Sequence, residues 1–249
     1  MSNKPDLVLG FYEAAEHQRQ KSAPIDAGRI AALMPLLTTG RAPDLLDIGC
    51  YDGAKTAILA EYVGAKRVCG VDFLAEQLDL ARGRGIETAR IDLNQGEGLP
   101  FADRSFDLIF VGDVIEHIFS PDLLLEEIAR LLRPGGYALL TTPNLASWRN
   151  RIALLLGWQP FMTEVSTRYR VGNPRAPAGL PSGHIRVFAP RALRELPTYY
   201  GLVVVYLGGM RLPGRPAGLI GRLSHLIDKL LLRVAPTLCD ELVIKLERR

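Results

Sequence analysis

The chain has 249 residues and a mass of 27.4 kDa, which suits one large domain or one domain with an added lobe. Hydrophobic residues make up 48% of it and charged residues 23%, which excludes a disordered chain, a collagen-like repeat and a disulfide-stapled miniprotein. The net charge of +3 is small, and no apolar run reaches the roughly 18 to 20 residues of a transmembrane helix.

The pattern along the chain begins with helices and then alternates strands with helices. Apolar spacing predicts helices over residues 7–20 and 25–37, which we interpret as an N-terminal helical lid within residues 1–40. Strands are predicted over residues 44–49, 66–71, 88–91, 106–111, 137–142, 202–206 and 241–246. Additional helices are predicted over residues 54–62, 75–84, 121–132, 148–158, 190–200 and 217–234.

This alternation of strands and helices is typical of βαβ units around a parallel sheet. The predicted strands are continuous apolar runs, as expected when helices cover both faces of a sheet. The main domain is therefore expected to span residues 41–249. Residues 145–215 interrupt the regular alternation with a Pro-, Gly- and Arg-rich stretch, which we interpret as an insertion over a substrate site.

Three successive strands end in a glycine turn or an acidic residue. Gly49 and Gly53 follow the first strand, and because glycine has no side chain a ligand can approach the backbone closely there. Asp72 ends the second strand, where a carboxylate accepts hydrogen bonds from ribose hydroxyls, and Asp92 ends the third, within reach of an adenine amino group. The spacing of the glycines is not that of the dinucleotide or phosphate-loop motifs, and a strand-end Asp also commonly caps a helix.

The ordered combination of these motifs resembles a class I S-adenosylmethionine (SAM)-dependent methyltransferase. The resemblance covers residues 40–145, and it rests on Asp47-Ile48-Gly49-Cys50-x-x-Gly53, Gly70-Val71-Asp72, Asp92-Leu93, Phe106-Asp107-Leu108-Ile109 and Leu132-Arg133-Pro134-Gly135-Gly136. It implies an α/β fold, Rossmann-like and doubly wound, whose seven-stranded sheet has helices on both faces and an antiparallel last strand.

The resemblance also implies which residues bind SAM. The glycine turn contacts the amino-acid moiety, Asp72 binds the ribose, Asp92 and the backbone of Leu93 hold the adenine, and Gly112 lines the methionine end. The sequence departs from the usual Gly-x-Gly-x-Gly pattern because Tyr51 stands at its middle glycine. The full set of predicted cofactor residues is Asp47, Gly49, Cys50, Tyr51, Gly53, Asp72, Phe73, Asp92, Leu93, Gly112 and Asp113.

The next motif is Asp113-x-x-Glu116-His117. On a helix this spacing would place the three side chains on one face, as a divalent-metal set requires. Here the chain resembles the ubiquinone-biosynthesis O-methyltransferase branch, whose Glu-x-x-Glu-His is associated with magnesium. Because Asp113 is one methylene shorter than that glutamate, we predict no metal and keep magnesium as the alternative. His117 then packs near the sulfonium or acts as a general base, with Glu116 beside it.

A second histidine lies in the run Gly183-His184-x-Arg186-x-Phe188, which resembles the same branch, where it faces the acceptor pocket. Histidine is the natural base for methylating a hydroxyl because its pKa is near 7. The predicted catalytic residues are therefore His117, His184 and Glu116. In the alternative interpretation His184 only caps a loop and Arg186 forms a local ion pair. Tyr12 and His17 are expected to close over the cofactor from the first helix.

The C-terminal part of the chain is basic and has two apolar helical stretches. Residues 145–249 carry 16 Lys and Arg against 6 Asp and Glu, whereas residues 1–144 carry 14 against 21. Residues 217–234 place an apolar stripe opposite charged residues, as a helix does at a membrane surface, in a core or at a dimer interface. Peripheral membrane contact and a homodimer are both left open.

The sequence therefore predicts a SAM-dependent O-methyltransferase that acts on a hydroxyl of a small or lipid-linked acceptor. The alternatives are an N-methyltransferase and a SAM-binding protein without transferase activity. We do not expect a nucleic-acid substrate, because the Asn/Asp-Pro-Pro-Tyr element of many base methyltransferases is absent. Three cysteines without a short-spaced pair, and an N-terminus unlike a signal peptide, predict a cytoplasmic protein with reduced thiols.

Overall fold

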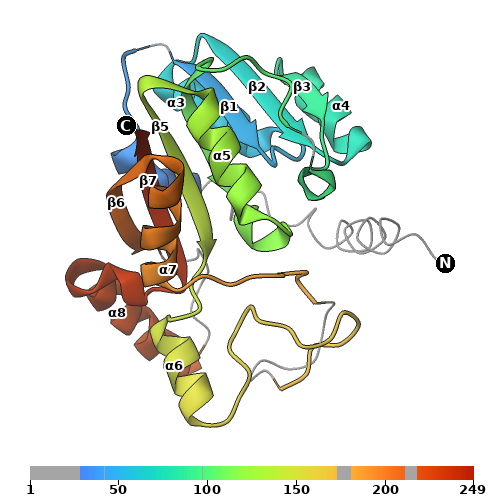
Figure 1. Cartoon of the computed structure of the whole chain (residues 1–249). Coiled ribbons are helices and arrows are strands. Elements are labelled where there is room, and N and C mark those ends of the chain that lie inside the picture. Colours follow the sequence, from blue (N-terminus) through green and yellow to red (C-terminus); the bar gives the residue numbers. More distant parts are fainter. Residues whose placement is uncertain (1–28, 42, 97, 173–180, 211–217) are drawn as a thin grey trace, which may run out of the picture.

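The computed structural model describes residues 29–41, 43–96, 98–172, 181–210 and 218–249. Figure 1 shows a twisted sheet with helices packed against it, and α6 and α8 lying together beyond one end. The strands are β1 Asp44–Ile48, β2 Arg67–Asp72, β3 Glu87–Arg90, β4 Phe106–Gly112, β5 Leu132–Pro143, β6 Leu202–Met210 and β7 Glu241–Arg248. The α-helices are α3 Ala54–Val63, α4 Ala75–Gly83, α5 Pro121–Leu131, α6 Trp148–Leu155, α7 Pro190–Glu195 and α8 Gly218–Val234, and the short 3₁₀ helices are η1 Met34–Leu36, η2 Leu93–Gln95, η3 Ile115–His117, η4 Leu196–Tyr200 and η5 Pro236–Leu238.

The seven strands form one sheet in the order β3-β2-β1-β4-β5-β7-β6. β3, β2, β1, β4 and β5 pair in parallel, whereas β7 runs antiparallel to both of its neighbours. This topology confirms the predicted seven-stranded sheet with an antiparallel last strand. It also brings the carboxyl ends of β1 to β4 to one edge, where open α/β sheets bind their ligands.

Two hydrophobic cores lie on opposite faces of the sheet, because neighbouring residues of a strand point to opposite sides. Leu46 and Ile109 pack in the cluster that includes α5, whereas Leu45 and Leu108 pack in the cluster that includes α3. Residues 29–33 are helical, and Ile30 and Leu33 are almost fully buried in the second cluster. The described end of the predicted N-terminal lid is therefore part of the core. Tyr12 and His17 lie outside the described residues.

Several predicted boundaries move for local reasons. β5 begins at Leu132, five residues before its predicted start, because Leu132 already pairs with Phe106 across a register shift. α6 ends at Leu155 and the chain turns at Gly157, whose φ is +75°. The predicted helix 190–200 is divided into α7 and the 3₁₀ helix η4, with Pro197 near the start of η4.

The predicted insertion, residues 145–215, contains both sheet and non-sheet structure. β6 is an integral strand that pairs with β7, whereas the described residues 145–172 and 181–189 lie outside the sheet and include α6. The two ends of this excursion meet, since Leu145 N donates to Phe188 O at 3.0 Å. Cys50, Cys69 and Cys239 are buried and free. Among the described helices, none is both long and apolar enough to cross a bilayer.

Candidate active site

The turn between β1 and α3 needs both of its glycines. Gly49 has a φ of +81°, and a Cβ there would lie 2.3 Å from Val114 Cγ2. Gly53 has a φ of +75°, and its Cβ would lie 2.5 Å from Ile86 Cδ1. Gly49 N and Cys50 N both donate to Val71 O, at 2.8 and 3.1 Å, so the turn is attached to the end of β2. A side chain at either glycine would displace this attachment.

Tyr51 adopts the conformation that explains why glycine is usual at its position. Its φ is +51°, in the left-handed region that a non-glycine residue enters at a cost of roughly 1–2 kcal/mol. Tyr51 N donates to Asp72 Oδ2 at 3.0 Å, and this contact holds the strained residue in place. The departure from the glycine pattern therefore leaves the backbone path of the turn intact.

Asp72 and Asp92 lie at the ends of neighbouring strands, as predicted. The second oxygen of Asp72, Oδ1, accepts from Leu74 N at 3.0 Å, and the residue is 9% exposed. Asp92 accepts from Asn94 N at 2.9 Å and caps the 3₁₀ helix η2. Phe73 and Leu93, which directly follow these aspartates, are half-buried. Both carboxylates thus combine a local capping contact with a position at the ligand edge.

Asp47 lies beneath the turn in the core. It is 2% exposed, and it accepts a hydrogen bond of 2.5 Å from Thr56 Oγ1. Burial raises the pKa of Asp47 to about 6, although the Thr56 hydroxyl and the Lys55 charge act in the opposite direction. Asp47 joins β1 to α3, and it supports the glycine turn from inside.

Gly112 and Asp113 end β4 beside the glycine turn, but Asp113 does not start a helix. Its φ is +58°, and η3 begins only at Ile115. The expected single helical face for Asp113, Glu116 and His117 is therefore wrong. Asp113 Oδ1 accepts from Thr141 Oγ1 at 3.0 Å, and Oδ2 forms an ion pair with Arg29. The Asp113 carboxylate therefore binds these two residues and does not join Glu116 and His117.

Arg29, Asp113 and Glu241 form a part-buried ionic group that the sequence did not reveal. One guanidinium nitrogen of Arg29 contacts both carboxylates. Burial raises the pKa of Asp113, but the Arg29 and Lys55 charges outweigh this effect and hold it below its ordinary value. Burial and the Asp113 charge raise the pKa of Glu241 well above its ordinary value. The group fixes the end of β4 against β7 and the N-terminal segment.

Replacing Arg29 by alanine is expected to lower the free energy of unfolding by about 3–5 kcal/mol, because it leaves the buried Glu241 and the part-buried Asp113 without their cation. Urea unfolding at neutral pH measures the change. Arg82→Ala is the matched control, since its pair with Asp79 is exposed and contributes about 0–1 kcal/mol. Equal stability of the two variants would show that the Arg29 group is not a structural requirement.

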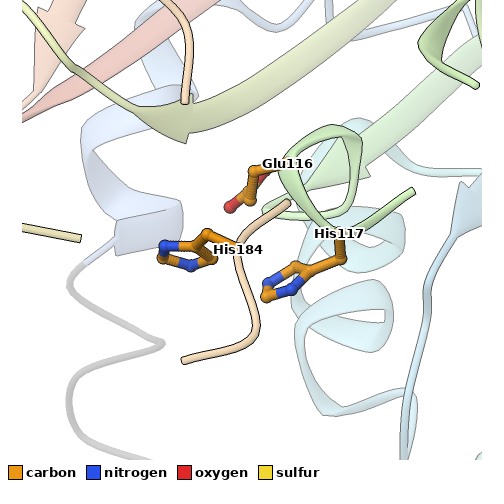
Figure 2. Close-up of side chains that lie close together, drawn as sticks. All are labelled: Glu116, His117 and His184. Carbon is orange, nitrogen blue, oxygen red and sulfur yellow. The ribbon is translucent and has the colours of Figure 1, made fainter. Parts of the chain in front are cut away.

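Glu116, His117 and His184 converge beside this edge (Figure 2). The two imidazole ring centroids are 4.7 Å apart, and one potential ligand atom from each of the three residues lies within 4.8 Å of the others. Ile185 N and Arg186 N donate to Glu116 O at 2.8 and 3.1 Å, which attaches the chain after His184 to η3. The structure thus joins the three predicted catalytic residues, although they come from distant segments.

The same cluster is oriented by backbone carbonyls. His184 Nδ1 lies 2.8 Å from Met162 O, and His117 Nδ1 lies 3.2 Å from Gly183 O. A carbonyl only accepts, so each Nδ1 carries a proton and each neutral ring has its lone pair on Nε2. Burial lowers the pKa of His184, which favours the neutral ring. Glu164 accepts from Gly183 N at 2.9 Å and positions the loop; its role was not predicted.

Glu116 is the most enclosed member of the cluster, being 0% exposed. Its Oε2 accepts from Thr142 Oγ1 at 3.0 Å, and its Oε1 is buried and has no hydrogen-bond partner among the described residues. Burial, and then the Asp113 charge, raises the pKa of Glu116 well above its ordinary value. Two imidazoles and a carboxyl are also a donor set of the kind that divalent transition metals accept. Arg186 donates to Ile118 O at 3.2 Å, which attaches the chain after His184 to the end of η3.

Comparisons with known proteins agree with this geometry. The methyltransferase-domain family matches residues 16–207. A demethylmenaquinone methyltransferase from Lactobacillus johnsonii is 36% identical over 47% of this chain and 49% of its own length. A ubiquinone biosynthesis O-methyltransferase from Idiomarina loihiensis is 33% identical over 50% and 54%, respectively. The chain thus spans about half the length of these curated relatives.

Solved structures share the whole fold at low sequence identity. A SAM-dependent methyltransferase from Thermotoga maritima superposes with a TM-score of 0.63 at 15% identity, covering 97% of this chain and all of that one. Another from Mesorhizobium loti gives 0.58 at 17% identity, covering 88% and 96%. Because the family match covers most of the chain, and the strand order and ligand edge are those that the motifs implied, the protein belongs to the class I SAM-dependent methyltransferases.

Proposed function

We propose that SAM lies along the edge formed by β3, β2, β1 and β4. The Gly49–Gly53 turn receives the amino-acid moiety, Asp72 the ribose hydroxyls, and Asp92 with Leu93 the adenine. This assignment is supported by the sheet order, which places these residues in one row, and by the hydrogen bond that Asp72 already makes to the turn. Gly112 and Asp113, at the end of β4, then lie at the methyl end.

We further propose that the acceptor binds beside Glu116, His117 and His184, between the sheet edge and the described residues 145–172 and 181–189. The observation that carries the proposal is the convergence of these three side chains within 4.8 Å. Glu116 lies only three residues after Asp113, so the cluster is adjacent to the proposed methyl end. Two oriented imidazoles at this point provide a means of removing a proton from the acceptor.

The chemistry is transfer of a methyl group to a hydroxyl oxygen. His184 Nε2 takes the hydroxyl proton while the oxygen attacks the methyl carbon, and the breaking C–S bond returns its electron pair to sulfur. S-adenosylhomocysteine leaves, and His184 then releases the proton to solvent. A positioned base of this type contributes about 10²–10⁴-fold, and alignment of the two reactants contributes further. Met162 O holds the His184 ring, and His117 and Glu116 lie beside it, where they position the acceptor hydroxyl.

Two alternatives make different predictions. An amine acceptor needs no enzyme base once it is deprotonated, so its rate follows the pKa of the amine rather than that of a histidine. A SAM-binding protein without transferase activity binds SAM and methylates nothing. One of the two curated relatives named above is a ubiquinone biosynthesis O-methyltransferase, which supports a hydroxyl acceptor, and the other is a demethylmenaquinone methyltransferase.

The test is transfer of labelled methyl groups from SAM to a panel of phenols, sugars and detergent-dispersed isoprenoid phenols, with the matching amines. We expect labelled hydroxyl acceptors only, and a rate that rises with pH below the ordinary histidine pKa of 6.5 and then levels off as His184 becomes neutral. Labelled amines would establish the N-methyltransferase instead. The same assay in EDTA is expected to give an unchanged rate; a loss that Mg²⁺ or Zn²⁺ restores would make the cluster a metal site.

A further inference from the structure

The helix α8 presents its apolar side to solvent. Leu219, Leu223, Leu226 and Leu230 follow one another at intervals of four, three and four residues, which places them on one face. These four side chains are between 58% and 84% exposed. An amphipathic surface helix normally turns such a stripe toward the core. The arrangement in this protein is the reverse.

The opposite side of α8, which carries Ser224 and Asp228, faces the protein. Asp228 is only 6% exposed, and it accepts from Trp148 Nε1 at 2.9 Å and from Arg149 at 2.7 Å. Ser224, one turn earlier, also contacts Arg149. Rotating the leucines inward would break this buried network, and the removal of one partner from a buried ion pair is strongly destabilising. The outward stripe is therefore fixed by α6.

The helix α6, which packs against α8, also exposes apolar side chains. Ile152, Leu155 and Leu156, in and just after α6, and the following Trp158 are between 47% and 85% exposed. Figure 1 shows α6 and α8 side by side at one end of the molecule, away from β3. We call the exposed residues of these two helices the α6–α8 surface.

The charges along the stripe are all positive. Arg222, Lys229 and Arg233 are exposed and share one row beside the leucines, and none of them has an ion-pair partner in the described part of the chain. Asp228 is the only acidic residue of α8, and it is buried. A second copy docked by a two-fold axis would bring these cations together without any compensating acid, so a dimer is disfavoured here.

We propose that the α6–α8 surface docks on an anionic lipid bilayer, with α8 lying in the plane of the interface. Leucines and a tryptophan entering the headgroup region, with flanking lysine and arginine, are the composition of helices that lie on membranes. Each cation near an anionic surface contributes attraction of its own, which the neutral lipids do not supply. This inference does not rest on the proposed acceptor or base.

The test is sedimentation of the full-length protein with phosphatidylcholine vesicles, with and without phosphatidylglycerol. We expect binding to the anionic vesicles that weakens with salt. The double variant Leu223→Asp/Leu226→Asp and the triple variant Arg222→Glu/Lys229→Glu/Arg233→Glu are each expected to lose at least about 100-fold in affinity. Leu80→Asp and Lys66→Glu, exposed positions on α4 and before β2, are matched controls that keep wild-type binding.

Each other outcome overturns the proposal. Wild-type protein that ignores anionic vesicles, or α8 variants that bind as well as wild type, would show that this surface does not bind lipid. A wild-type dimer in analytical ultracentrifugation that these α8 substitutions dissociate, without vesicle binding, would assign the surface to a second copy. Titration of every variant with SAM verifies that it is folded. This control measures a property that does not depend on vesicle binding.

Discussion

Asp72→Ala is expected to abolish detectable SAM binding, with a loss in affinity of at least about 100-fold. The carboxylate is proposed to accept hydrogen bonds from the ribose, and it also holds Tyr51 N at 3.0 Å in the strained turn. Hydrogen bonds to a charged group contribute about 1.5–3 kcal/mol each, so losing two of them accounts for the expected effect. Isothermal titration calorimetry with SAM and S-adenosylhomocysteine measures it.

The matched control for this substitution is Asp79→Ala. Asp79 is an exposed carboxylate on α4, and among the described ion pairs it contacts only Arg82, in the last turn of the same helix. Its removal should leave SAM affinity unchanged. Circular dichroism of Asp72→Ala separates lost binding from lost structure. Tight binding by a folded Asp72→Ala protein would refute the proposed ribose contact, and the SAM position along the sheet edge would have to be revised.

His184→Asn is expected to lower kcat by about 10²–10⁴-fold while SAM affinity stays within about twofold of wild type. The reason is that asparagine keeps a donor for Met162 O but removes the base at Nε2. The rise in rate with pH that the neutral imidazole causes should disappear as well. Initial rates with the acceptor identified in the panel, measured across pH, provide the comparison.

His117→Asn and His225→Asn complete the set. His117 lies in the same cluster, so we expect a smaller loss in kcat and a non-additive double variant, since the two imidazoles act together. His225 is on α8, outside the cluster, and its replacement should not affect the rate. Full turnover by the His184 and His117 double variant would exclude a histidine base and favour an amine acceptor.

The sequence by itself determined the sheet, its glycine turn and the strand-end carboxylates. These features depend on short windows: an apolar run predicts a buried strand, and a glycine with positive φ is required wherever the turn approaches its neighbour closely, as Gly49 approaches Val114. Parallel strands that alternate with helices then bring Asp72 and Asp92 to the same edge without further information.

The tertiary structure alone decided which distant residues meet and which way a helix faces. Arg29 reaches Glu241 across 212 residues, and His117 meets His184 only because the loop that Glu164 holds returns to η3. Periodicity showed that the leucines of α8 share one face but not where that face points. The buried bond from Trp148 to Asp228 turned it outward, because rotation about the helix axis is set by partners far away in the chain.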